Sequence, residues 1–390
     1  MTKYQIVIWE NDADEAARIL RETLTARLQE LGLNADSFVF LDSSSLKTRD
    51  PKAPIVGAFL SRSPSPPKRG DIVALLVEGV MVLPVVEELA HYNSYVFEEL
   101  RGINGMEFKT EDPDMERVAA VLMEGLNLIR KNRRLFVSYR RNETHGTAIQ
   151  LYEALDRNGF DVFLDTVSIR PGEPFQDVLW HRLADTDVIV LLDSPGFLAS
   201  RWTTEELAKA NSTNIQILQL VWPGNMLTAS AAFSRAFPLE TTDFEGGIHL
   251  GSNARLKESV VQNILNEAES LRARALAARF AYLVEEFCAQ ARVQGLNPQI
   301  QPERFISIRT PSGDFVATVP TIGVPDATRY QEIEDELAKH PSRHSEMMLL
   351  YDERGVRQKW LKHLSWLDRN KLPVRSLQVA QCAAWLRGLK

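Results

Sequence analysis

The sequence predicts a multidomain protein of the α/β class, built from parallel sheets and the helices that connect their strands. Short apolar runs of strand length alternate with segments whose apolar residues recur every three or four positions. This alternation is typical of parallel sheets with connecting helices. The chain also has 390 residues, and because one hydrophobic core rarely serves so long a chain, two or three domains are expected.

Residues 1–110 predict an N-terminal α/β domain. Residues 4–9 and 37–42 are apolar runs of strand length, and the segment between them carries apolar residues at helical spacing. Residues 71–77 predict a third strand that is buried on both faces. Residues 85–100 predict a helix.

Four patterns follow one another after a helical connector that is expected at residues 111–132. A strand at 135–138 leads into a doubly basic loop, a second strand ends in an aspartate, a third ends in Asp-Ser-Pro, and a Trp-x-x-x-Glu element comes last. Residues 133–235 therefore predict one central domain. The polar and loop-forming residues of these patterns are Tyr139, Arg140, Arg141, Asp165, Ile169, Pro171, Gly172, Phe175, Ser194, Trp202 and Glu206.

The last third of the chain predicts a long helical segment and a further α/β domain. Residues 255–292 contain neither glycine nor proline, which favours one long helix or two helices in a hairpin. In residues 300–390, a Pro-Ser-Gly-Asp turn predicts a hairpin over 305–319. Helices are then expected at 327–340, 355–367 and 382–389, and strands at 347–351 and 374–379. The histidines here lack the spacing of a zinc site, so no metal is expected.

Composition excludes several classes of protein. The net charge of −7 argues against a protein that coats nucleic acid. The two cysteines, Cys288 and Cys382, cannot form a disulfide framework and are interpreted as core thiols. The N-terminal residues do not resemble a secretory signal, and no apolar run approaches the roughly 18 residues of a membrane span. A cytoplasmic protein without membrane contact is expected.

In this order and spacing, the four patterns resemble a TIR (Toll/interleukin-1 receptor) domain. The resemblance is closest to the TIR domains that hydrolyse NAD, in which a Trp-x-x-x-Glu element supplies the catalytic glutamate. It implies a flavodoxin-like parallel sheet for residues 133–235. Residues 1–110 repeat the order of strands and helices. They are interpreted either as a degenerate TIR-like domain without a catalytic site or as another domain of the same broad class.

The resemblance implies a nucleotide site at the carboxyl ends of the strands, where ligands bind in open parallel sheets. An arginine suits a phosphate, an aromatic ring suits stacking, and a carboxylate suits a ribose. The expected substrate-binding residues are Tyr139, Arg140, Arg141, Asp165, Ser194 and Trp202. The loop through which TIR domains contact one another is expected to contain Ile169, Pro171, Gly172 and Phe175.

The implied reaction is cleavage of the nicotinamide–ribose bond of NAD+, with Glu206 as the catalytic residue. Positive charge develops on the ribose as nicotinamide leaves, as in glycoside hydrolysis, and a nearby carboxylate stabilises that charge. The neighbouring Glu205 points about 100° away around a helix and matches the family pattern less well. No Gly-x-Gly-x-x-Gly or Walker loop is present, so NAD+ is expected as a consumed substrate and no cofactor is expected.

The resemblance also implies a biological setting, that of a bacterial antiviral effector that depletes NAD+ when its TIR domains assemble. The flanking domains are expected to hold the TIR domain inactive or to bring copies together on a trigger, and the activating partner is not identified. Two alternatives stay open. One is a TIR enzyme that makes a cyclised ADP-ribose signal, and the other is a non-enzymatic scaffold. In a scaffold, changes at Gly172 or Phe175 would abolish function, whereas a change at Glu206 would not.

Overall fold

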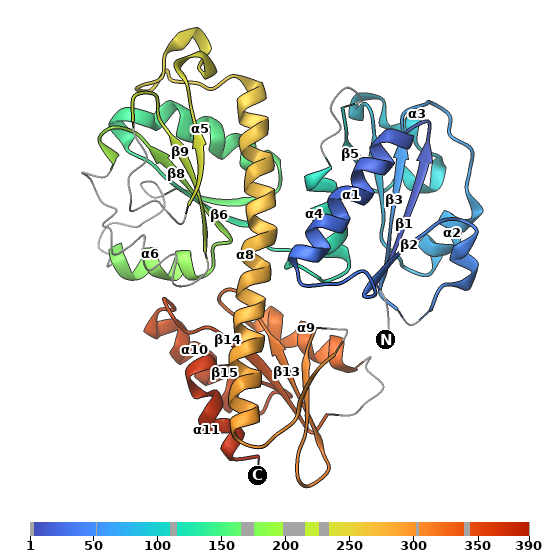
Figure 1. Ribbon diagram of the computed structural model, residues 1–390, viewed down its shortest axis with the longest axis vertical. Coiled ribbons are helices and arrows are strands. Elements are labelled where there is room, and N and C mark those ends of the chain that lie inside the picture. Colours follow the sequence, from blue (N-terminus) through green and yellow to red (C-terminus); the bar gives the residue numbers. More distant parts are fainter. Residues whose placement is uncertain are drawn as a thin grey trace. The chain divides into compact units, whose positions relative to one another are not determined.

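The computed structural model describes residues 4–51, 53–109, 115–164, 175–197, 215–225, 234–301, 304–338 and 344–389, apart from the side chains of 175–179. The chain forms two compact units, Met1–Lys131 and Asn132–Lys390. Within the described residues, the first unit holds one five-stranded sheet and the second holds two, and Figure 1 shows each sheet with its helices. The α/β class that the sequence predicts is confirmed.

The first unit contains a parallel sheet in the order β2-β1-β3-β4-β5. Its strands are β1 (Tyr4–Asn11), β2 (Phe38–Leu41), β3 (Ile55–Ser61), β4 (Val82–Val86) and β5 (Met106–Glu107), and its helices are α1 (Asp14–Glu30), α2 (Gly70–Val77), α3 (Tyr92–Tyr95) and α4 (Glu116–Gly125). Arg27 of α1 donates hydrogen bonds of 2.9 and 2.8 Å to the Glu116 carboxylate of α4. Helix α4, from the segment 111–132, therefore packs within this unit.

Two elements of the first unit differ from the prediction. Residues 71–77 form helix α2 rather than a strand, since Ile72 and Leu75 are buried while Val77 is 84% exposed. A short apolar run has no decisive periodicity, so it suits either structure. The third strand in sequence is instead β3, where Gly57 lies so close to the Trp9 ring that a Cβ would collide with it. Residues 85–100, predicted as one helix, contain the end of β4 and the short helix α3.

The central domain is a second parallel sheet, in the order β10-β9-β8-β6-β7. Its strands are β6 (Arg134–Ser138), β7 (Asp161–Leu164), β8 (Val188–Asp193), β9 (Gln216–Val221) and β10 (Arg235–Pro238), and its described helices include α5 (Arg141–Arg157) and α6 (Phe175–Ala184). In this sheet and in the N-terminal one, the first strand lies between the second and the third, so both have the same strand order. Side chains alternate along β8: Val190 packs in the core that contains α5, and Ile189 packs with Leu183 of α6.

A single helix, α8 (Glu258–Val293), joins the central domain to the C-terminal one, so the segment 255–292 is not a hairpin. Its 36 residues span about 54 Å. Ile264 and Leu271 lie in the core of the central domain, whereas Leu283 and Phe287 lie in the core of the C-terminal domain. Figure 1 shows α8 in orange, running from one sheet to the other. Although α8 is long, no described helix is both long and apolar enough to cross a membrane.

Buried charged groups fasten the middle of α8 to the amino edge of the central sheet. The Arg272 Nε donates to the Asp187 carboxylate at 3.0 Å, and these two side chains are 1% and 0% exposed. The Arg279 guanidinium donates to the carbonyl oxygens of Thr186 and Ala184 at 2.9 and 2.6 Å. Charges are buried at low cost only when they are paired, so these contacts hold α8 in one position on the central domain.

The C-terminal domain has a mixed sheet in the order β11-β12-β13-β14-β15, with antiparallel pairing up to β13 and parallel pairing after it. Its strands are β11 (Pro298–Ile300), β12 (Ile306–Arg309), β13 (Phe315–Pro320), β14 (Glu346–Tyr351) and β15 (Val374–Gln378), and its helices are α9 (Ala327–Ala338), α10 (Gln358–Arg369) and α11 (Cys382–Arg387). The predicted hairpin is confirmed, with Gly313 at its turn in a left-handed conformation (φ 95°). Single turns of 3-10 helix occur elsewhere in the chain, at Ser45–Thr48, Leu89–His91, Glu98–Leu100, Thr241–Asp243, Glu245–Gly247 and Val379–Gln381.

The C-terminal domain also contacts the amino edge of the central domain directly. The backbone N–H of Val324 donates to Asp185 Oδ1 at 3.0 Å, and the backbone N–H of Arg357 donates to His181 Nδ1 at 3.4 Å. The ring of His181 also lies 5.5 Å from that of Trp360. These contacts and α8 connect the same end of the central sheet to the C-terminal domain.

Candidate functional site

The strand order of the central sheet locates the place where a ligand is expected. Strand β6 is flanked by β7 on one side and by β8 on the other, so the connection from β6 to β7 and the connection from β7 to β8 run in opposite directions along the sheet. In open parallel sheets, ligands bind outside the carboxyl ends of the strands at such a switch point. The loops that meet there begin at Tyr139 after β6 and at Ser194 after β8.

Tyr139 lies in the core rather than on the surface of this edge. Its side chain is 4% exposed and belongs to the hydrophobic core of the central domain. The hydroxyl group is 3.4 Å from Nδ1 of His145, and the two rings stack with their centroids 6.0 Å apart. In this arrangement the ring is covered, so the hydroxyl is the part of Tyr139 that lies near polar groups.

A charged bridge crosses the switch point. The Arg140 Nη1 donates to Glu143 Oε1 at 2.5 Å, and Glu143 Oε2 accepts a hydrogen bond of 3.1 Å from the backbone N–H of Gly196. The backbone oxygen of Glu143 also accepts from the N–H of Gly251 at 2.6 Å. A Cβ at position 196 would collide with both the guanidinium and the carboxylate. Glu143 therefore ties the loop after β6 to the loop after β8, and Arg140 lies directly over Gly196.

The end of β8, three residues before Gly196, belongs to a buried polar cluster. Asp193 ends β8 and is 1% exposed, and its Oδ2 accepts a 2.7 Å hydrogen bond from Nε2 of Gln219. The Oε1 of Gln219 in turn accepts from the Ser234 hydroxyl at 2.6 Å. Burial raises the pKa of Asp193, and the Gln219 and Asn225 amides act in the opposite direction. Ser194 is also 1% exposed.

Of the remaining predicted site residues, only Arg141 has a described side chain. Arg141 is exposed at the first turn of α5. Phe175 begins α6, but its side chain is not among those described. Asp165, Ile169, Pro171, Gly172, Trp202 and Glu206 lie outside the described residues.

Three residues of this edge were not predicted from the sequence. Glu143 follows Arg140 by three positions at the start of a helix, a spacing that favours ion pairing, so the Arg140–Glu143 pair could have been predicted from the sequence. Asp193 ends an apolar strand, and a carboxylate in that position also indicates a polar group at the carboxyl edge of the sheet. Nothing local indicates Gly196, because its contact with Arg140 joins residues from two separate loops.

Outside this edge, the described residues contain neither a metal site nor a reactive thiol. The described part of the chain holds no group of three or more histidine, cysteine, aspartate or glutamate side chains that could bind a metal. Cys288 and Cys382 are buried, and burial raises the pKa of both thiols, that of Cys382 to about 12. The interpretation of both as core thiols is confirmed, because a thiol with a raised pKa is a weak nucleophile.

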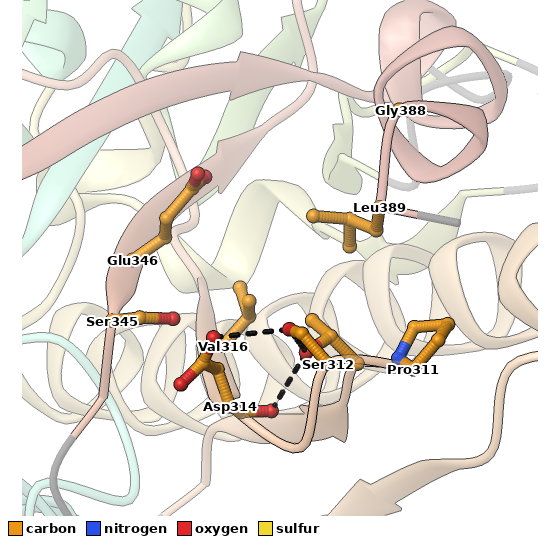
Figure 2. Close-up of a pocket in the computed structure, with 9 residues that line it drawn as sticks. Pro311, Ser312, Asp314, Val316, Ser345, Glu346, Gly388 and Leu389 are labelled. Carbon is orange, nitrogen blue, oxygen red and sulfur yellow. Dashed lines mark hydrogen bonds between the residues drawn. The ribbon is translucent and has the colours of Figure 1, made fainter.

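A surface pocket of about 500 Å³ lies in the C-terminal domain, beside the turn of its hairpin (Figure 2). Its polar groups are already engaged: the Ser312 hydroxyl donates to Asp314 Oδ2 at 3.0 Å, and Glu346 pairs with Arg375 at 2.9 Å. Figure 2 shows the Ser312 and Asp314 side chains bonded to each other at the rim. The pocket therefore offers no unpartnered chemistry comparable to that of the central sheet.

Comparison with known proteins adds one informative match. Residues 135–235 match the family model of the TIR domain, and no curated protein matches the chain closely enough to count as a relative. Among solved structures, the chain is similar to proximal thread matrix protein 1 from the mussel byssus, with 9% identity over 69% of this chain and 96% of that one and a TM-score of 0.21. It is also similar to an extracellular ligand binding receptor from Desulfohalobium retbaense, with 12% identity over 81% of this chain and 56% of that one and a TM-score of 0.18. A third similar structure is histidinol-phosphate aminotransferase from Sinorhizobium meliloti, with 11% identity over 72% of this chain and 87% of that one and a TM-score of 0.19. TM-scores this low do not indicate a shared fold.

The family match and the geometry of the central sheet agree. The matched residues begin in β6 and end at the start of β10, so they contain the switch point and its two loops. The chain therefore contains a TIR domain, at residues 135–235.

Proposed function

We propose that the TIR domain is an NAD+ glycohydrolase with Glu206 as its catalytic residue. The observation that supports this most directly is the bridge of Arg140, Glu143 and Gly196 across the switch point of a TIR sheet. It holds a guanidinium group at the edge of the sheet where a ligand is expected, and arginine is well suited to bind phosphate. The matched family segment also contains the Trp202 and Glu206 pair.

The proposed reaction breaks the bond between C1′ of the ribose and the pyridinium nitrogen. The bonding electron pair moves to that nitrogen, which becomes neutral as nicotinamide leaves. The ribose then carries oxocarbenium-like positive charge, which the Glu206 carboxylate stabilises electrostatically. Water adds to C1′ and loses a proton, so the products are nicotinamide, ADP-ribose and one proton. NAD+ is a substrate in this scheme and no separate cofactor takes part.

The other site residues have roles in binding. Arg140 and Arg141 contact the phosphates, and the Tyr139 hydroxyl, Asp165 and Ser194 provide polar contacts to the sugars. Trp202 supplies an aromatic surface. The segment that contains Ile169, Pro171, Gly172 and Phe175 brings two TIR domains together, and self-association completes the site in a cytoplasmic effector of antiviral defence. An activating partner sets off this assembly.

The test is nicotinamide release and NAD+ loss, measured by chromatography at high protein concentration with a crowding agent. We expect Glu206→Ala to lower the rate by about 100-fold or more, as removal of a transition-state charge stabiliser does. Glu205→Ala is the matched control, since it removes the adjacent carboxylate and should keep most of the activity. Equal rates in both variants would refute the assignment of Glu206. A cyclised product in place of ADP-ribose would identify a cyclase.

A further inference from the structure

Three buried polar atoms at the carboxyl edge of the TIR sheet have no hydrogen-bond partner in the described structure. They are the hydroxyl oxygen of Ser138, Oδ1 of Asp193 and the hydroxyl oxygen of Ser194. The three residues are 0%, 1% and 1% exposed. Leaving a buried polar group unbonded is destabilising, and native proteins do so rarely. Three such atoms at one edge of one sheet therefore call for an explanation.

The three residues surround the switch point. Ser138 is the last residue of β6, Asp193 is the last residue of β8, and Ser194 follows it. Ser138 is paired with Leu191 in the sheet register, so Asp193 lies two positions further along the neighbouring strand. Side chains alternate along strands, and therefore those of Ser138, Leu191 and Asp193 are on the same face. The unpartnered atoms belong to adjacent strand ends where a ligand is expected.

The Asp193 carboxyl is held in a fixed orientation. Its Oδ2 accepts from Gln219, and Gln219 is held by Ser234, at 2.7 and 2.6 Å. The other oxygen, Oδ1, is left open. An open carboxyl oxygen on the same face as the Ser138 hydroxyl, with Ser194 as the next residue of the chain, would provide acceptors and donors for a pair of neighbouring hydroxyls on a ligand. A carboxylate binds the ribose hydroxyl in the same general way in other open parallel α/β sheets.

The electrostatics of the cluster agree with this use. Burial raises the pKa of Asp193, because no solvent stabilises its charged form. Hydroxyl groups of a ligand would donate to Oδ1 and stabilise the carboxylate. The bridge of Arg140 and Glu143 lies on the same loop pair, since Glu143 is bonded to Gly196, two residues after Ser194. A phosphate contact and a sugar contact would therefore be adjacent.

We propose that Ser138, Asp193 and Ser194 form a subsite that binds the 2′- and 3′-hydroxyls of a ribose of the nucleotide. This inference rests on the proposed function, because NAD+ is the nucleotide that it assigns to the edge. It adds a substrate class to the site: ligands with an intact ribose diol are bound, and deoxyribose analogues are discriminated against. Asp193 binds the substrate here and does not replace Glu206 in the chemical step.

The test measures binding without turnover. The Kd of NAD+ is determined by calorimetry in the full chain carrying Glu206→Ala, with and without Asp193→Asn, Ser138→Ala or Ser194→Ala. Two NAD+ analogues, each lacking the 2′-hydroxyl of one ribose, are compared with NAD+. We expect Asp193→Asn to weaken NAD+ binding by about 10- to 100-fold, as loss of a hydrogen bond to a charged group does. Asp161→Asn, an exposed aspartate at the opposite end of β7, is the matched control and should leave Kd unchanged.

Two further readouts separate binding from a structural role. With one of the two deoxy analogues, the effect of Asp193→Asn should disappear, because the hydroxyl that the carboxylate binds is then missing. The melting temperatures of the unliganded Ser138→Ala and Ser194→Ala proteins should stay the same or rise, since an unbonded buried hydroxyl is removed. A lowered melting temperature with an unchanged Kd would overturn the inference.

The inference and the proposed function fail in different ways. If NAD+ binds and depends on Asp193 but the wild type does not cleave it, the subsite stands and the hydrolase assignment fails. If the wild type cleaves NAD+ but binding is indifferent to all three substitutions, the subsite is refuted and the hydrolase stands. If NAD+ does not bind to the full chain, both are refuted.

Discussion

The buried ion pair of Asp187 and Arg272 should contribute strongly to the docking of α8 on the TIR domain. The two groups are 3.0 Å apart and 0% and 1% exposed, and Asp187 Oδ2 also accepts from the backbone N–H of Arg134 at 3.2 Å. The perturbation is Asp187→Asn, which removes the negative charge with little change in volume. It leaves the Arg272 guanidinium buried without the charge of Asp187.

The expected magnitude follows from that burial. Breaking a buried pair by removing one partner costs about 3–5 kcal/mol, because an uncompensated charge remains in a low-dielectric region. For domains of about 150–250 residues, each kcal/mol lowers the melting temperature by about 2–4 °C. The unit that contains the pair, Asn132–Lys390, is of this order of size. We therefore expect a decrease of roughly 6–20 °C.

The assay is urea and thermal unfolding followed by circular dichroism. The matched control is Arg235→Met, which breaks a 3.1 Å ion pair between Arg235 of β10 and Glu267 of α8. These side chains are 57% and 30% exposed, so the control should cost less than about 1 kcal/mol. The double variant Asp187→Leu with Arg272→Met should recover much of the loss, since neither charge of this pair is left buried. If Asp187→Asn is no more destabilising than the control, the reasoning is refuted.

Two further predictions concern the carboxyl edge and the contact with the C-terminal domain. Gly196→Ala places a Cβ against the Arg140 guanidinium, so the rate of NAD+ cleavage should fall about tenfold or more. The control is Gly102→Ala, where a Cβ meets nothing within 4 Å, and it should not change the rate. Equal cleavage rates in the two variants would contradict the role of the bridge. Burial and the Arg357 charge lower the pKa of His181 from 6.5 to about 4, so the folded protein keeps the ring neutral while the unfolded chain protonates it. The free energy of unfolding should therefore decrease as the pH falls from about 6.5 towards 4. Urea midpoints of His181→Gln should decrease less than those of the wild type over that range, and parallel decreases would exclude this contribution.

The prediction from sequence succeeded where an element carries its own periodicity and punctuation. The hairpin over 305–319 contains Gly313, whose left-handed backbone conformation favours glycine. Strand β8 is an apolar run that is buried on both faces. It was wrong at residues 71–77, because seven residues are too few for the helical and extended patterns to differ. Only burial by neighbouring elements, with Ile72 inside and Val77 outside, decides that α2 is a helix.

The sequence by itself determined the α/β class, the helical character of residues 255–292 and the ordered patterns by which residues 135–235 are recognised as a TIR domain. Arg140 and Ser194 could be placed at the carboxyl ends of strands for the same reason, since strand ends are local features. Only the tertiary structure decided which groups meet across the sheet. The pairing of Arg272 with Asp187 joins residues 85 positions apart, and the contact of Glu143 with Gly196 joins residues 53 positions apart. Such contacts depend on strand order and on the β6–β8 register, which exist only after distant segments have packed together.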